Sequence, residues 1–217
     1  STLMRSSAAS DVYKRQVLGL TVAFAALSQT LTINGTASVN AAEWDVGIIS
    51  NEDGTIPINV ETEGDAKVLS EYIATKTSIS NIGVSITKPG DMVTYGTLLK
   101  NSGTIDARLE SVEISTLCTL SSPVESCDWN NDGSVTQEDV DKVNNNISFV
   151  VYAGAGTGDV NLLKAGNYGK LYLLVGYGKY KYGEGGAVVT LEESTELPKR
   201  DLTFNDLSVK VNFVQAD

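Results

Sequence analysis

Apolar side chains recur at every second position through most of this chain, and this period constrains the fold class more than any other feature. A period of two places successive side chains on opposite faces of a strand, so each such run predicts a half-buried β-strand. The clearest run covers residues 202–214. Its inward positions are expected to be Leu207, Val209, Val211 and Phe213. The other runs are residues 31–39, 44–48, 82–86, 93–99, 105–114, 147–152, 171–177 and 187–191.

These runs are short and are separated by turns rich in Gly, Asn and Asp. The pattern predicts an all-β fold, an antiparallel β-sandwich or jelly roll that forms one domain over residues 28–217. The alternation slips by one position around Glu110 and Ser111, which predicts a β-bulge there. Only residues 66–75 and 137–143 carry a helical pattern, so one or two short helices are expected.

The charge balance and the missing histidine exclude several classes of function. The chain has 27 acidic and 16 basic residues, a net charge of −11, and it contains no His. An acidic surface repels phosphate backbones, so no nucleic-acid partner is expected. The absence of His removes the usual general base and the commonest zinc ligand. We therefore expect no enzymatic activity and no catalytic residues.

The N-terminal region has the pattern of an export signal. Lys14 and Arg15 precede an apolar run at residues 17–27, and Ala23-Phe24-Ala25 fits a small-x-small cleavage site. The run is too short to span a bilayer comfortably, so contact with a membrane would be transient and the mature chain secreted. The alternative is a buried helix of the domain. Residues 6–16 resemble a translated sequencing adapter, so we expect residues 1–16 to be foreign to the native chain or disordered.

One loop, Asp128–Asp139, carries a specific chemical pattern. Oxygen-bearing side chains fall at loop positions one, three, five and twelve, and Gly133 takes position six, where the chain must turn sharply. At position seven Ser134 would offer its backbone carbonyl, and at position nine Thr136 would act through a water molecule. This is the spacing of an EF-hand calcium loop with Asp in place of the final Glu, and it resembles the loops of dockerins. No entering helix precedes it, so it is half of an EF-hand. The alternative is a surface turn without metal. The expected structural Ca²⁺ ligands are Asp128, Asn130, Asp132, Ser134, Thr136 and Asp139.

Two cysteines lie just before this loop. Cys118 and Cys127 are the only cysteines of the chain, and in an exported protein they would form one local disulfide. The alternative is a pair of buried free thiols. With the loop and the second helix, the pair makes residues 117–146 a disulfide and calcium-loop insertion in the sandwich.

Tyrosines are concentrated in residues 165–186, at positions 168, 172, 177, 180 and 182. A tyrosine offers flat apolar area with a polar tip, which suits sugars or protein partners. The alternative is a strand pair with tyrosines at its rim.

Three stretches together carry a resemblance to a known family: residues 28–46 (SQTLTINGTASVNAAEWDV), 88–109 (KPGDMVTYGTLLKNSGTIDARL) and 197–216 (LPKRDLTFNDLSVKVNFVQA). They resemble the TasA/camelysin group of exported proteins of Gram-positive bacteria, which includes β-sandwich subunits of biofilm matrix fibres. The resemblance implies assembly by donor-strand exchange, with residues 30–39 as the donated strand. The alternative is that this strand pairs within its own sandwich. The anchors of the donated strand would be Leu31, Ile33, Ala37 and Val39.

The expected function is that of a calcium-stabilised structural subunit of an extracellular filament or biofilm matrix, with copies of the same chain as partners. The alternative is a monomeric cell-surface module that binds a glycan or a surface protein. The metalloprotease activity ascribed to camelysin-type proteins is not carried over, because the chain has neither a His nor an HExxH motif.

Overall fold

The computed structural model describes residues 42–120, 127–154, 159–192 and 194–216. The chain divides into two units, residues 1–41 and residues 42–217, and all of the described residues belong to the second. The expected sequencing remnant (1–16), the hydrophobic segment (17–27) and the strand with Leu31, Ile33, Ala37 and Val39 lie outside the described residues.

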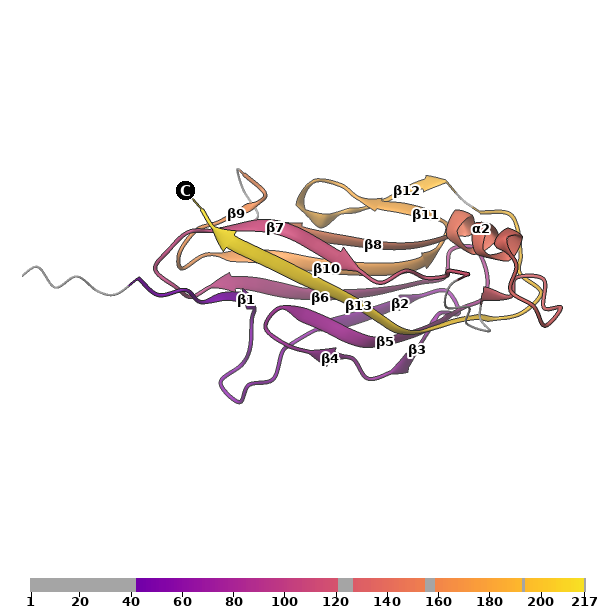
Figure 1. The fold of residues 1–217 in the computed structure, drawn as a ribbon, viewed down its shortest axis with the longest axis horizontal. Helices are drawn as coiled ribbons and strands as arrows, with labels where there is room; N and C mark the ends of the chain where they lie inside the picture. Colours follow the sequence, from indigo (N-terminus) through magenta and orange to yellow (C-terminus); the bar gives the residue numbers. More distant parts are fainter. Residues whose placement is uncertain (1–41, 121–126, 155–158, 193, 217) are drawn as a thin grey trace, which may run out of the picture. The chain divides into compact units, whose positions relative to one another are not determined.

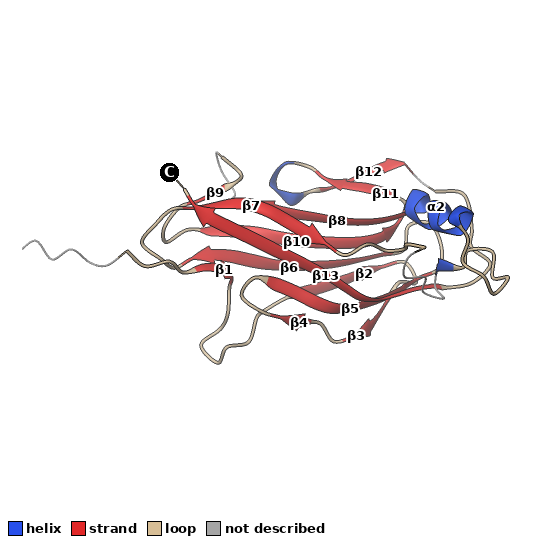
Figure 2. Cartoon of the chain, viewed as in Figure 1, coloured by secondary structure: helices blue, strands red, loops and turns tan. Residues whose placement is uncertain are grey.

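Two antiparallel sheets form the second unit, and strands dominate its secondary structure (Figures 1 and 2). In the first sheet, β1 and β2 both pair with one edge of β6, while β10 and then β8 follow on its other side. β1 and β2 therefore act as one interrupted edge strand. The strands of this sheet are β1 (Val46–Ile48), β2 (Asn59–Glu63), β6 (Met92–Asn101), β10 (Tyr168–Tyr177) and β8 (Ile147–Gly154).

The second sheet repeats this arrangement. Here β3 and β4 both pair with one edge of β5, and β13, β7 and β9 follow in that order. β13, the last strand of the chain, is central and pairs on both sides. The strands are β3 (Lys67–Ser70), β4 (Ile73–Ala74), β5 (Ser78–Ile86), β13 (Leu202–Gln215), β7 (Ala107–Ile114) and β9 (Leu162–Leu163). The predicted antiparallel β-sandwich is confirmed.

The core is built from the inward positions of both sheets. In β10, the odd positions Leu171, Leu173 and Val175 are fully buried, and Val84 and Ile86 of β5 belong to the same cluster. Burying one such side chain contributes about 1.5 to 3 kcal/mol, so the period-two pattern itself holds the two sheets together. The even positions of β10 consequently lie on the outer face of the first sheet.

A helix and a hairpin complete the unit (Figure 1). The helix α2 (Gln137–Asn146) leads directly into β8, and the hairpin consists of β11 (Lys179–Tyr182), the short helix η2 (Glu184–Gly186) and β12 (Val188–Glu192). The buried hydroxyl of Ser148 donates to the carbonyl of Gly178 and accepts from the N–H of Tyr180, which ties the hairpin to β8. Within the described ranges, no helix is long and apolar enough to cross a membrane.

The predicted bulge is confirmed. Ser111 pairs with Asn212 while Leu109 pairs with Phe213, so Glu110 is the extra residue of β7. On β13, Leu207, Val209 and Val211 are buried and Phe213 is half-buried against the core, as the alternation predicts.

The two helix predictions have opposite outcomes. The helix predicted at residues 137–143 is confirmed as α2. The helix predicted at residues 66–75 is wrong, because this segment forms β3 and β4 along β5. Pairing with a buried strand outweighs the modest helix propensity of Ala, Leu and Glu.

Candidate functional site

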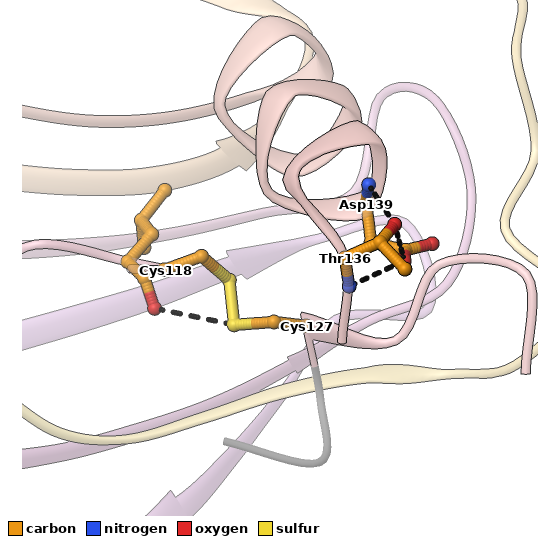
Figure 3. Close-up of a disulfide and its surroundings, with 5 residues drawn as sticks. Cys118, Cys127, Thr136 and Asp139 are labelled. Atoms are coloured by element: carbon orange, nitrogen blue, oxygen red, sulfur yellow. Dashed lines mark hydrogen bonds between the residues drawn. A yellow bond between two sulfur atoms is a disulfide. The ribbon is translucent and has the colours of Figure 1, made fainter. Parts of the chain in front are cut away.

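The Asp128–Asp139 loop connects a disulfide to the first turn of α2 (Figure 3). The predicted bond between Cys118 and Cys127 is confirmed, with the two Cα atoms 5.9 Å apart and both residues buried. Cys127 immediately precedes Asp128. The first residue of the loop is therefore attached to a fixed point of the structure.

The first half of the loop wraps around the carboxylate of Asp128. Its Oδ1 accepts the N–H of Asp132 at 3.1 Å, and its Oδ2 accepts the N–H of Gly133 at 2.8 Å. The amide oxygen of Asn130 also accepts from the N–H of Asp132, at 2.9 Å. Gly133 has φ +90°, a left-handed conformation that favours glycine, as its place at the sharp turn predicts.

The second half of the loop ends in a capping box. Thr136 is the N-cap of α2, and Oδ2 of Asp139 accepts its hydroxyl at 2.5 Å and its N–H at 2.9 Å. Figure 3 shows these two side chains pointing toward each other at the start of the helix. Oδ1 of Asp139 accepts the N–H of Asn130 at 3.4 Å, which links the end of the loop to its beginning.

These hydrogen bonds determine the charge state of Asp139. Burial raises the pKa of its carboxyl, but the hydrogen bonds from Thr136, Asn130 and Trp129 together outweigh burial and hold the pKa below its usual value. Asp139 is therefore ionised at neutral pH.

The donor atoms of the loop suit calcium better than a transition metal, because all of the expected ligands are oxygen atoms. Asp128 and Asp139 are only 2% and 1% exposed, and neither forms an ion pair with a described Lys or Arg. Buried carboxylates of this kind are normally paired with a cation. Across the described ranges, however, no three His, Cys, Asp or Glu side chains gather into a metal-binding group. Asp132, Ser134 and Thr136 are exposed. A cation would therefore draw on two buried carboxylates, the exposed carboxylate of Asp132, and amide and backbone oxygens of the loop.

Trp129 fixes the loop to the sandwich, and the sequence analysis did not identify it. It is 3% exposed, its ring centroid lies 6.2 Å from that of Tyr177, and its carbonyl accepts the N–H of Lys199. The signal in the sequence was a large aromatic residue directly after the first position of the loop, which indicates that the loop packs against the core. Asp128 thus lies between two anchors, the disulfide and Trp129.

The tyrosines fall into separate groups. Tyr152, Tyr172 and Tyr182 pack together, with ring centroids 6.0 to 6.2 Å apart, and join the hairpin to the outer face of the first sheet. Tyr177 is buried, whereas Tyr168 is 51% exposed. Most of the tyrosine-rich segment therefore serves packing, and its exposed part lies at the start of β10.

Compared with models of protein families, with curated proteins and with solved structures, the chain matches none.

Proposed function

We propose that this protein is a structural subunit of an extracellular filament or biofilm matrix. Copies of the chain join when residues 30–39 of one copy add to an open sheet edge of the next, and calcium bound by the Asp128–Asp139 loop stabilises each subunit. The observation that carries the proposal is the outer edge of β7.

Among the residues that the structure describes, few pair with the outer edge of β7. β9 pairs only with Ala107 and Arg108, and the N–H of Leu109 donates to the carbonyl of Asn161. From Glu110 to Ile114, no described strand pairs with the outer side of β7. A row of unpaired backbone groups on an edge strand is a template for strand addition.

The direction of the backbone groups fits strand addition. The N–H of Ser115 donates to Ser208 just beyond β7, on the side of β13. Because backbone groups alternate along a strand, the N–H groups of Ile114 and Val112 point away from β13, toward the open edge. Ile114 is also 47% exposed, so the edge offers an apolar side chain together with unpaired backbone groups.

The expected donor strand supplies the complementary pattern. Leu31, Ile33, Ala37 and Val39 alternate with polar residues, so one face of such a strand is apolar. A contact between an edge of one copy and the N-terminal strand of another uses two different surfaces. Such a head-to-tail contact extends into a filament when it does not close into a ring.

Electron microscopy and size-exclusion chromatography of the mature protein, with and without calcium, test the proposal. We expect polymers that disappear when residues 26–40 are deleted. Ile114→Lys should also abolish polymers, because a charge on the edge opposes strand pairing. The matched control is Ile73→Lys, an Ile that is 59% exposed on the opposite edge of the same sheet, which should leave polymers intact. Monodisperse monomers of the unmodified protein at all concentrations would refute the proposal.

The second candidate function is a monomeric cell-surface module that binds a glycan or a protein. The exposure of Tyr168 and Lys170 on the first sheet is the observation that favours it. This candidate requires a ligand for a protein that stays monomeric, whereas the filament requires none.

A further inference from the structure

The outer face of the first sheet carries a patch of aromatic, apolar and basic side chains near the start of β10. Tyr168 pairs with Lys100 and Lys170 pairs with Leu98 across the strands β10 and β6. Directly paired residues lie on the same face of a sheet, and residues 168, 170 and 172 share that face. We name this patch the Tyr–Lys shelf; it consists of Leu98, Lys100, Tyr168, Lys170 and Tyr172.

The two lysines of the shelf are held against rings and not against carboxylates. Nζ of Lys100 lies 5.3 Å from the ring centroid of Tyr168, and Nζ of Lys170 lies 5.9 Å from that of Tyr172. These are cation–π distances. Among the described residues, neither ammonium has a carboxylate oxygen within 4.0 Å. Two neighbouring ammonium groups without a described carboxylate partner favour an anionic ligand at this place, although the chain as a whole has a net charge of −11.

The shelf has a fixed end and an exposed end. At the fixed end, a Cβ added to Gly186 would lie 2.6 Å from the ring of Tyr172, so the turn of the hairpin rests closely on that ring. At the other end, Tyr168 is 51% exposed and Leu98 is 42% exposed. Flat apolar area is therefore available to a ligand without any movement of the hairpin.

The spacing of the shelf suits a linear polymer. Outside the part that the hairpin covers, the side chains at positions 168 and 170 follow one another along β10 at an interval of about 6.8 Å, and those of Lys100 and Leu98 lie beside them on β6. A stable protein interface requires about 800 Å² from each partner, with an apolar core. The five side chains of the shelf offer much less area than such an interface needs, which favours a polysaccharide over an acidic protein.

We propose that the Tyr–Lys shelf binds a linear anionic polysaccharide, with its carboxylates at Lys100 and Lys170 and its sugar rings against Tyr168 and Leu98. This inference deepens the second candidate function, on whose exposed residues Tyr168 and Lys170 it rests, by naming the ligand class; it depends on neither the calcium loop nor the edge of β7.

Affinity electrophoresis and titration calorimetry in EDTA test the shelf, with polygalacturonate as the carboxylated probe, dextran as the neutral probe and poly-glutamate as the acidic polypeptide. EDTA removes binding that is bridged by calcium. We expect binding to polygalacturonate that weakens with added salt, and no binding to dextran. Lys100→Gln with Lys170→Gln should weaken binding by about tenfold or more, as should Tyr168→Ala, because each removes a direct contact.

The matched control is Lys67→Gln with Lys210→Gln, which removes the same charge from exposed positions of the second sheet. This pair should bind polygalacturonate as tightly as the unmodified protein. An equal loss in the control pair would show a non-specific effect of net charge and would overturn the proposal. Equal binding of poly-glutamate, or no binding of polygalacturonate, would also overturn it. None of these outcomes bears on polymer formation, which is measured without a glycan.

Discussion

The backbone N–H of Asp65 donates a 2.8 Å hydrogen bond to Oδ1 of Asp91, a residue 26 positions further along the chain. The other oxygen of this carboxylate accepts the N–H and the hydroxyl of Thr87 and the N–H of Lys88. Asp91 is fully buried, so one carboxylate satisfies backbone groups of two turns. It thereby links the turn between β2 and β3 to the turn between β5 and β6.

This arrangement predicts a pH dependence of stability. Burial raises the pKa of Asp91, but the hydrogen bonds from Asp65, Thr87 and Lys88 outweigh burial and hold its pKa below the usual value. A lowered folded-state pKa means that ionised Asp91 stabilises the fold above the unfolded-state pKa of about 4, and that this contribution is lost as the pH falls through the folded-state value. Asp91→Asn should therefore cost about 1 to 3 kcal/mol of unfolding free energy at pH 7. In urea denaturation, the difference from the unmodified protein should shrink below pH 4. A difference that stays constant down to pH 2 would contradict this account.

Asn101 should be a second polar residue on which the fold depends. Its amide donates to the carbonyls of Ile105 and Leu163, its Oδ1 accepts the N–H of Gly103, and it is 1% exposed. Asn101→Ala leaves these buried groups unpaired and should cost about 3 kcal/mol of unfolding free energy. Asn59→Ala, at an exposed position of β2, should change stability by no more than about 0.5 kcal/mol. Equal effects of the two substitutions in chemical denaturation would refute the role of Asn101.

Much of the sandwich can be predicted from the sequence, because a strand that buries one face needs apolar residues at every second position. β13 and the bulge at Glu110 are predicted in this way, since an extra residue must shift the apolar phase. The segment 66–75 shows where local patterns fail. Its residues favour a helix weakly, and only the presence of β5 beside them decides in favour of β3 and β4.

Of the candidate sites, one could be predicted from the sequence and the others could not. The candidate calcium loop could be predicted from the sequence, because its expected ligands follow one another at fixed spacing within twelve residues. The sequence alone does not predict the Tyr–Lys shelf or the cluster of Tyr152, Tyr172 and Tyr182, because the members of each come from different strands. Which residues become neighbours depends on the register between β6, β10 and β8, and no local pattern encodes that register.

Calcium should stabilise the folded protein. Binding to the folded state alone adds about 2.7 kcal/mol when free calcium exceeds the dissociation constant about a hundredfold. Differential scanning calorimetry should therefore show a higher melting temperature in calcium than in EDTA. Asp128→Asn with Asp132→Asn should abolish this rise, because it removes two charges. One acceptor oxygen remains at each position, so Asp128→Asn loses only one of the two backbone hydrogen bonds that its carboxylate accepts.

The control for this experiment is Glu52→Gln with Glu71→Gln, an equal charge change at two exposed positions outside the loop. This pair should retain the full calcium response. An unmodified protein whose melting temperature is the same in calcium and in EDTA would show that the loop is a turn without metal.

The disulfide should act on both stability and calcium affinity, because Cys127 directly precedes Asp128. Cys118→Ser with Cys127→Ser opens a loop of about ten residues and should cost about 2 to 3 kcal/mol in EDTA by the chain-entropy estimate. It should also raise the calcium concentration needed for half of the melting-temperature rise, since Asp128 then loses one of its two anchors and must be ordered by the ion. Trp129 remains buried against Tyr177 in the variant, so binding should be weakened and not abolished. An unchanged calcium midpoint together with the expected loss of stability would show that the disulfide braces the sandwich alone and does not position Asp128.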